Sequence, residues 1–527
     1  MWITSHEYRS KVEGCWMGKN IGGTLGAPFE GQRGVVDIDF YTQDLGGEPL
    51  PNDDLDLQLV WLNAVEKYGR AVTASILGEY WHSYITPSWS EYGLGKNNMR
   101  KGLVPPLSGW VNNPYRDSCG CFIRSEIWAC LAPGHPELAA RYAYEDAIVD
   151  HSTDGVYGEI FVAAVQSAAF VESDKFKLID IGLSWIPADC GVARGVRCAL
   201  ESYRKGLEWK AARKAVLTEV PDHFALRYMA EPEEDVPWGP VGYDAPANVA
   251  IFVLGWLYGE DDFGRSLCIA VGCGEDTDCT GATLGATLGI IHGIEGIPAK
   301  WIEPIGNKIT TISLNLGDAF GLFPRTIQDL TDRVMRLTPR FMDLRDVDVL
   351  NAKDGYRLQM REPDDLVSRP YLLSSGFDFF RRGNLGPVKM KTFEEDVLAR
   401  QPFQVRYETP IYTAWIDYGG DPLVHAGQPV KLHLQFQNII PNPQWLEMEW
   451  FLPEGWQVSP AKKTNLTLPQ FNFGLNGNAE VDFTISSGEL PLTEMRYDLL
   501  LSIKSTGRHT HLVIPVTLLT ASEGVSN

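Results

Sequence analysis

Two regularly spaced runs of glycine constrain the fold of this chain more than any other feature of its sequence. Each run repeats a glycine at every fourth residue, and the positions are Gly14, Gly18, Gly22 and Gly26, then Gly281, Gly285, Gly289 and Gly293. A glycine inside a helix costs about 1 kcal/mol relative to alanine, so two such runs need a compensating gain. Residues four apart share one face of a helix, where missing side chains let another backbone approach closely. The two ladders therefore predict two unusually close helix packings, against each other or against other helices.

The spacing of apolar residues divides the chain into a helical part and a strand-rich part. Up to about residue 344 apolar residues recur at helical spacing, as they do over residues 55–65. The clearest strand-like runs, which alternate apolar and polar residues and are separated by Gly, Pro and Asn turns, are residues 430–436, 479–485 and 511–518. For a chain of 527 residues we predict a multidomain protein with an all-α catalytic domain over residues 1–344, a connector with short elements over 345–400, and an all-β, immunoglobulin-like sandwich over 401–520.

The composition argues against some classes of partner. Lys and Arg total 46 against 68 Asp and Glu, giving a formal net charge of -22, and such a surface repels nucleic-acid backbones and anionic membranes. We therefore expect neither nucleic acid nor a membrane as a partner. The N-terminal stretch lacks the basic and apolar regions of a secretory signal, and nine cysteines in so long a chain suit reduced thiols, so we expect a cytoplasmic protein. The sequence leaves the oligomeric state open.

Acidic residues gather directly before two predicted helices. Asp276 and Asp278 lie just ahead of the second glycine ladder, and Asn52, Asp53 and Asp54 lie ahead of an amphipathic helix. Each cluster alone is typical of a helix cap that complements the helix dipole. Neighbouring acids repel unless a positive charge lies between them, however, and two such clusters together favour a shared divalent cation. The oxygen ligands would suit Mg²⁺, with Mn²⁺ or Ca²⁺ as alternatives, better than zinc.

Three segments, in this order along the chain, carry a resemblance to a known family. They are residues 14–30, 52–54 and 274–285, and together they are similar to the signature segments of the ADP-ribosylglycohydrolase family. The similarity covers about residues 8–337. It implies an all-α domain with a binuclear Mg²⁺ centre that hydrolyses the glycosidic bond at C1 of ADP-ribose.

The resemblance assigns roles to individual residues. The metal-ligand positions fall on Asn52, Asp53, Asp54, Asp276, Asp278 and Cys279. Glu30 occupies the position of an acidic residue beside the substrate, and we predict that it acts in catalysis with Asp54 and Asp276. A carboxylate near C1 can activate water or stabilise an oxocarbenium-like charge. His151 resembles the family's histidine near the ribose, and a hydrogen-bonded structural histidine is an equal alternative.

This chain departs from the family pattern at three positions. Asn52 stands where relatives usually have Ser or Thr, Cys279 where they commonly have Thr, and Gly23 where many have Asp. Cys279 is a soft ligand that suits magnesium poorly, so one ion is expected to be bound more weakly or replaced. These departures keep open the alternative of a non-catalytic binding protein with this fold.

Aromatic residues in loops near these motifs are candidates for substrate contacts. They are Trp81, Trp89, Tyr92, Trp110, Tyr115, Trp238 and Tyr243. Most buried tryptophans belong to cores, but flat side chains in Gly- and Pro-rich loops can stack on a base or a sugar ring. We predict Trp238 and Tyr243 as substrate-binding residues.

The predicted function is hydrolysis of a glycosidic bond at ADP-ribose or a related sugar. The alternative is a glycosidase acting on a non-nucleotide carbohydrate, which the appended sandwich favours.

Overall fold

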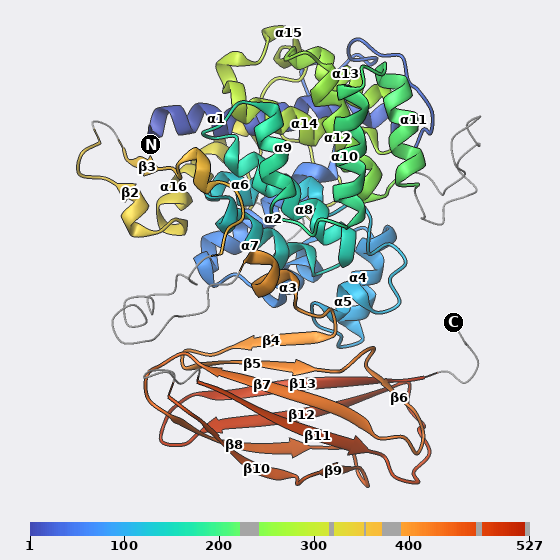
Figure 1. The fold of residues 1–527 in the computed structure, drawn as a ribbon, viewed down its shortest axis with the longest axis vertical. Coiled ribbons are helices and arrows are strands. Elements are labelled where there is room, and N and C mark those ends of the chain that lie inside the picture. The colour runs from blue at the N-terminus through green and yellow to red at the C-terminus, as the bar shows by residue number, and fades with distance from the viewer. Residues whose placement is uncertain (222–241, 316–320, 353–354, 371–391, 471–476, 522–527) are drawn as a thin grey trace. The chain divides into compact units, whose positions relative to one another are not determined.

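The chain folds into two compact units. The computed structural model describes residues 1–221, 242–315, 321–352, 355–370, 392–470 and 477–521 (Figure 1). The first unit contains residues 1–96 and 112–369, and the second contains residues 97–111 and the chain from residue 370 onward. The first is mainly helical and the second is a β-sandwich, so the predicted fold class is confirmed.

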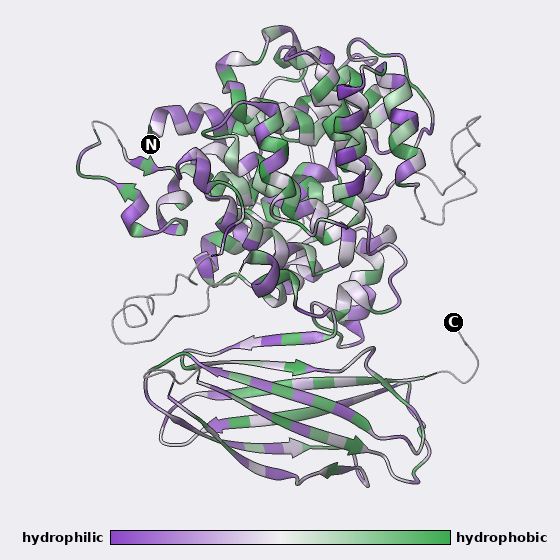
Figure 2. Cartoon of the chain, in the orientation of Figure 1, coloured by the Kyte–Doolittle hydropathy of each residue, from purple (hydrophilic) through white to green (hydrophobic). Residues whose placement is uncertain are grey.

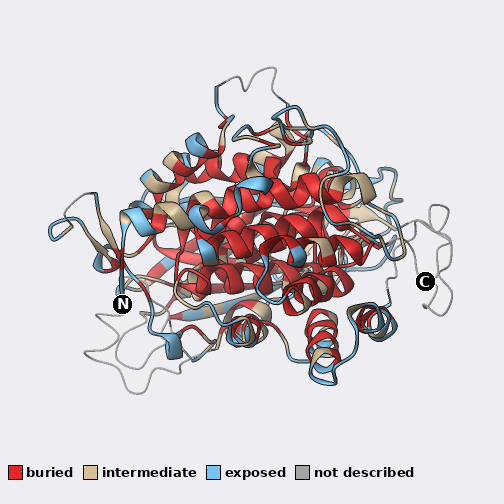
Figure 3. Cartoon of the chain, turned by 90° about the horizontal axis from the view of Figure 1, so that it is seen from above, coloured by how far each residue is buried: buried red, intermediate tan, exposed pale blue. Residues whose placement is uncertain are grey.

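The first unit is an assembly of helices whose central members are buried along most of their length (Figure 3). The helices of the chain are α1 (Ser5–Gly26), α2 (Asp53–Tyr68), α3 (Ala74–Tyr84), α4 (Ser90–Arg100), α5 (Leu107–Trp110), α6 (Glu126–Leu131), α7 (Pro136–Ala147), α8 (Thr153–Ala168), α9 (Lys175–Leu183), α10 (Gly191–Arg204), α11 (Trp209–Glu219), α12 (Ala245–Tyr258), α13 (Phe263–Gly272), α14 (Thr277–His292), α15 (Ala299–Ile302) and α16 (Ile327–Phe341). Within the described ranges, no helix combines the length and apolar character needed to cross a bilayer.

The two glycine ladders lie on α1 and α14, and these helices pack against each other. A Cβ on Gly18 would overlap the carbonyl oxygen of Gly285, and a Cβ on Gly285 would overlap that of Gly18. The same reciprocal contact joins the pairs Gly14–Gly289 and Gly22–Gly281. The residue numbers run in opposite directions, so the helices are antiparallel. The sequence leaves open whether the ladders pack against each other or against other helices. In the structure they pack against each other.

A small antiparallel sheet, which helical spacing does not predict, also belongs to the first unit. Its strands, in the order β1–β3–β2, are β1 (Trp2–Thr4), β3 (Arg357–Gln359) and β2 (Val347–Asp348). Strands β2 and β3 come from the predicted connector, and Trp185 donates a hydrogen bond to the carbonyl of Leu366 (3.0 Å) further along it. This stretch of the connector is therefore packed on the helical unit.

The second unit contains two five-stranded sheets in the orders β10–β8–β12–β13–β6 and β4–β5–β7–β11–β9. Its strands are β4 (Gln404–Glu408), β5 (Tyr412–Asp417), β6 (Leu423–Val424), β7 (Val430–Asn438), β8 (Gln444–Phe451), β9 (Gln457–Ser459), β10 (Lys463–Leu468), β11 (Asn478–Ser486), β12 (Arg496–Ser505) and β13 (His511–Thr520). The three strands predicted from alternation are β7, β11 and β13. Figure 2 shows the same alternation as changing hydropathy along the strands.

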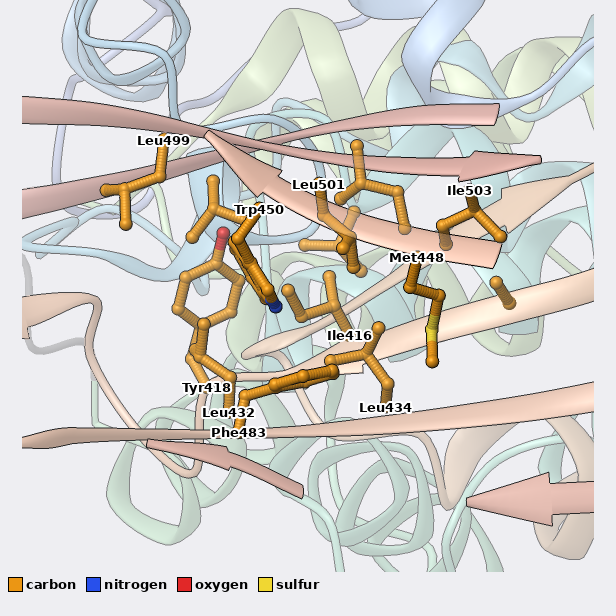
Figure 4. Close-up of a cluster of buried hydrophobic side chains, with 14 of the residues drawn as sticks. Ile416, Tyr418, Leu432, Leu434, Met448, Trp450, Phe483, Leu499, Leu501 and Ile503 are labelled. Carbon is orange, nitrogen blue, oxygen red and sulfur yellow. The ribbon is translucent and has the colours of Figure 1, made fainter. Parts of the chain in front are cut away.

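Apolar side chains from both sheets fill the space between them (Figure 4). Trp450 of β8 lies against Phe483 of β11, with ring centroids 5.3 Å apart. Leu103 and Leu107, from the segment 97–111, are buried in the same cluster. The sequence analysis places this segment in the helical domain. The spacing of apolar residues predicts a helix but does not tell which of the two cores that helix joins.

Candidate active site

The acidic motifs meet at a cavity of about 410 Å³ in the helical unit. The predicted site residues on its wall are Glu30, Asn52, Asp53, Tyr243, Asp276, Asp278 and Cys279. Asp54 is buried beside them, where Cys279 Sγ donates to its Oδ1 (3.4 Å). Segments more than 200 residues apart in the sequence therefore form one site, because Asp54 and Cys279 are separated by 225 positions.

The antiparallel pair of α1 and α14 brings two of these segments together. The Thr277 hydroxyl donates to the carbonyl of Gly26 (2.8 Å), where the first turn of α14 meets the last turn of α1. Just beyond, the Gly31 amide donates to the carbonyl of Glu275 (3.1 Å), and the Glu275 amide donates to that of Gln32 (3.1 Å). The end of the first ladder, which leads to Glu30, is thus held beside the start of the second.

Three overlapping groups of side chains have the spacing of metal ligands. In each group one donor atom per residue lies within 4.8 Å of the others, and the groups are Glu30–Asp276–Asp278, Asp54–Asp278–Cys279 and Cys119–Asp276–Cys279. One carboxylate oxygen each of Asp54, Asp276 and Asp278 is buried and has no hydrogen-bond partner within the described part of the chain. A buried anionic oxygen without a partner is costly. These donors fit a divalent cation.

The pKa values of these acids rise because burial and neighbouring charges disfavour their ionised forms. The charge of Asp278 raises the pKa of Glu30, which is exposed at the cavity wall, to about 8. Burial, with Asp278 second, raises the pKa of Asp53 to about 6, and burial raises the pKa of Asp276 well above its usual range. Lys19, which pairs with Glu126 at 3.0 Å, partly offsets the same effect on the pKa of Asp54. A bound cation would act on all of these groups in the opposite direction.

Asn52 is the N-cap of α2. Its side chain also accounts for a second departure from the family pattern, the glycine at position 23. Its side-chain oxygen accepts from the Asp54 amide (2.7 Å). A Cβ on Gly23 would overlap the Asn52 amide nitrogen, so the larger residue at position 52 fills space that a side chain at position 23 would need. The two departures are therefore structurally linked. In contrast, the side chain of Asp276 makes no capping hydrogen bond to α14, so capping does not explain why an acidic residue stands at this position.

Two tyrosines lie beside acids of the site. The Tyr92 hydroxyl donates to Asp53 Oδ2 (2.8 Å), and Tyr243 lies near enough to Glu30 to lower the pKa of that carboxyl slightly. Tyr243 is positioned by its backbone, because its carbonyl accepts from the Cys119 amide (2.9 Å). Tyr243 therefore lies on the cavity wall, as the prediction requires, and contacts an acid there.

His151 lies behind the wall of the cavity. Its Nε2 is 2.8 Å from the Ser118 hydroxyl, and its Nδ1 is 2.9 Å from Asp150 Oδ1. Asp150 in turn pairs with Arg124 (2.6 Å). Ser118 lines the cavity whereas His151 is not among the described lining residues, so any influence of the histidine on a ligand passes through that serine.

The aromatic candidates separate into three groups. Trp89, Tyr92 and Tyr115 line the cavity, and Trp89 is 49% exposed. Trp81 is buried, and Trp110 belongs to the second unit, where it donates to Asp421 (2.9 Å). The predicted substrate residue Trp238 lies outside the described residues.

The cavity wall also contains residues that the sequence analysis does not predict, among them Glu91, Ser118 and Cys119. Cys119 and Cys121 are closely spaced in the sequence, but without a second pair of cysteines this spacing is not a metal-binding motif. Gly120 would carry a Cβ overlapping Glu91 Oε1, so the missing side chain makes room for that buried acid. No pattern in the sequence signals this contact.

A comparison with protein families agrees with the ordered motifs. The profile described as ADP-ribosylglycohydrolase matches residues 4–340. Among solved structures, the chain is similar to an "ADP-ribosylglycohydrolase-related protein complex", with 18% identity and a TM-score of 0.40 over 64% of this chain and 100% of that chain. A structure of the yeast GGA1 GAE domain matches with 11% identity and a TM-score of 0.15, over 21% of this chain and 95% of that one. No curated protein matches the chain significantly.

Proposed function

The chain belongs to the ADP-ribosylglycohydrolase family, and we propose from this membership that it hydrolyses a glycosidic bond at ADP-ribose or a related sugar with the help of a binuclear Mg²⁺ centre. The observation that carries the proposal is a set of buried carboxylate oxygens, on Asp54, Asp276 and Asp278, that have no hydrogen-bond partner among the described residues. Such an arrangement destabilises the protein unless a cation joins it. The cytoplasmic location, and the exclusion of nucleic acid and membrane as partners, stay predictions from the sequence.

We assign the metal positions to the predicted ligands and the acid–base work to Glu30. A divalent cation bound there would polarise substrate hydroxyls and lower the pKa of bound water. Asp54, Asp276 and Asp278 would hold such an ion, with Asn52, Asp53 and Cys279 around them. Glu30, within 4.8 Å of the Asp276 and Asp278 ligand atoms, would accept the proton of the attacking water. A bound cation would lower the pKa of Glu30 from about 8 and so favour the ionised form that accepts a proton.

The remaining wall supplies surfaces for a substrate. Trp89 and Tyr92 have ring centroids 6.1 Å apart, with planes tilted by 31°. With Tyr115 they form an aromatic side of the cavity, on which a base or a sugar ring could stack. Ser118 offers a hydroxyl that His151 holds in place (2.8 Å), and we propose that it hydrogen-bonds a ribose hydroxyl.

The test combines metal content with a substrate panel. The full chain, stripped with a chelator and reloaded with Mg²⁺, should bind the ion and release ADP-ribose from an ADP-ribosylated peptide or a related conjugate. Release of sugar only from non-nucleotide glycosides would instead establish the alternative glycosidase. A protein that binds no divalent cation and cleaves none of these substrates would be a binding protein, and the proposal would be wrong.

A further inference from the structure

Two thiols belong to the acidic cluster. Cys119 lies in the loop before α6, and Cys279 lies in the first turn of α14. The two sulfur atoms and one oxygen of Asp276 lie within 4.8 Å of one another. Both cysteines are buried, with 2% and 7% of their surface exposed. The fold thus brings together a pair of thiols and a carboxylate from distant segments.

The geometry of Cys119 is directed at the acidic cluster. Its backbone is fixed by the hydrogen bond from its amide to the Tyr243 carbonyl (2.9 Å), and its Sγ donates to Asp276 Oδ2 (2.6 Å). The other oxygen of that carboxylate, Oδ1, is buried and has no hydrogen-bond partner among the described residues. A buried carboxylate oxygen left unsatisfied beside two thiols fits a positively charged group at this position.

Another buried cysteine shows what a merely structural thiol looks like. Cys121, two residues from Cys119, donates to the carbonyl of Gly155 (2.6 Å). Its hydrogen-bonding capacity is used by the backbone, and it is in none of the described ligand groups. Cys119 and Cys279, by contrast, donate to carboxylates of the candidate metal site.

The chemistry of the donors differs across the cavity. Glu30, Asp276 and Asp278 form a group of oxygen donors, whereas Cys119, Asp276 and Cys279 form a group with two sulfurs. Hard ions such as Mg²⁺ prefer oxygen, and thiolate ligands select softer ions such as Zn²⁺. Asp276 is common to both groups, which places two chemically different positions side by side.

We propose that Cys119, Asp276 and Cys279 bind a thiophilic divalent cation of the Zn²⁺ class, next to an oxygen-ligated position that takes Mg²⁺. This proposal deepens the proposed function, on which it rests, by making the centre chemically mixed. On binding, each S–H bond breaks, the proton passes to solvent and the sulfur electron pair bonds to the cation, so no oxidant or reductant is needed. The side of the centre near Glu30 remains an oxygen site.

Cobalt is a direct probe, because Co²⁺ bound by thiolate gives a sulfur-to-metal charge-transfer absorption in the near ultraviolet. The full chain, reduced and stripped of metal, should develop this band on titration with Co²⁺. Added Zn²⁺ should remove the band, whereas an excess of Mg²⁺ should not. This displacement needs no variant, so it tests the proposal even if the cysteine variants misfold.

The variants locate the sulfur ligands. Cys119→Ser and Cys279→Ser should each weaken the band or shift it strongly, and the matched control Cys121→Ser should keep it, with folding of all three checked by circular dichroism. Cobalt that binds without the band, or a band unchanged in both site variants, would overturn the mixed centre and leave the proposed hydrolase standing. A chain that binds neither Co²⁺ nor Mg²⁺ would overturn both.

Discussion

The centre of the helical unit and the core of the sandwich are both buried, yet they are built from opposite materials. Between the sheets, Trp450, Phe483 and their neighbours pack as apolar side chains. At the start of α14, the carboxylates of Asp276 and Asp278 are buried, and each has one oxygen with no hydrogen-bond partner in the part of the chain that the structure describes. The sandwich core therefore stabilises its own unit. The acidic centre lowers the stability of the unit that carries it, and the surrounding helices hold it in place.

The largest effect is expected at the acidic centre, because its buried carboxylates are proposed to serve the reaction and not the stability of the fold. Replacing Asp276 by Asn keeps the shape of the side chain and removes a charge that is common to two ligand groups. We expect kcat/KM to fall by about 10³-fold, or about 4 kcal/mol of transition-state stabilisation. Steady-state kinetics on the substrate identified by the panel would measure this.

The matched control is Asp154→Asn. Its carboxylate accepts from the Val192 amide (2.9 Å) at the start of α10, and it is not among the described cavity residues. Activity within a few-fold of wild type is expected here. Equal losses in both variants, or full activity of the Asp276 variant, would mean that the buried carboxylates have no special role.

The sandwich should respond to loss of packing instead of loss of charge. Trp450→Ala removes a fully buried ring and should lower the free energy of unfolding of the second unit by about 3–5 kcal/mol. Chemical denaturation followed by tryptophan fluorescence would measure it. Trp445→Ala, in the same strand but 55% exposed, should cost less than about 1 kcal/mol. Similar costs for the two would contradict the packing described for this core.

The contact between the two glycine ladders is neither apolar side-chain packing nor a charged site, because buried main-chain atoms make it. We expect an effect of intermediate size there. Gly285→Ala would place a Cβ on the carbonyl of Gly18, and we expect a loss of about 1–3 kcal/mol although alanine favours a helix. In the control Gly158→Ala, on α8, the new Cβ would meet side chains alone, the nearest being Ala245 at 3.3 Å, followed by Val249 at 3.6 Å and Phe122 at 3.7 Å. Thermal unfolding should separate the two. A stabilised Gly285 variant would show that the helices can move apart freely.

The smallest expected effect is a pH dependence specific to the acidic centre. The folded pKa of Glu30, about 8, lies above its ordinary 4.5. Between these values the native state keeps a proton that the unfolded state has lost, so raising the pH lowers stability across this window. We expect the Tm of the metal-free protein to fall from about pH 5 to pH 8, and saturating Mg²⁺ to reduce that fall. Glu30→Gln should flatten the metal-free profile, and a Tm that rises with pH would contradict the assignment.

The outcome shows what periodicity can and cannot reveal. The spacing of Gly18 and Gly285 predicted close packing, and the alternation of residues 430–436 predicted a strand, because both depend on local geometry. The segment 97–111 joins the sandwich unit, and Cys119 joins the acidic cluster. These placements depend on contacts between distant residues, for which the sequence carries no periodic signal.

The helix pair that meets through glycine has a consequence for which ions the protein can accept. Main-chain atoms cannot change rotamer, so the contacts between glycine carbonyls and backbone stop α1 and α14 from drawing closer to suit a smaller ion. Magnesium binds oxygen at about 2.0–2.1 Å and calcium at about 2.3–2.6 Å. If the proposed metal centre forms, a frame of this kind would discriminate between ions by radius. The glycines along α1 and α14 would thereby limit which ions the acids near the ends of these helices bind.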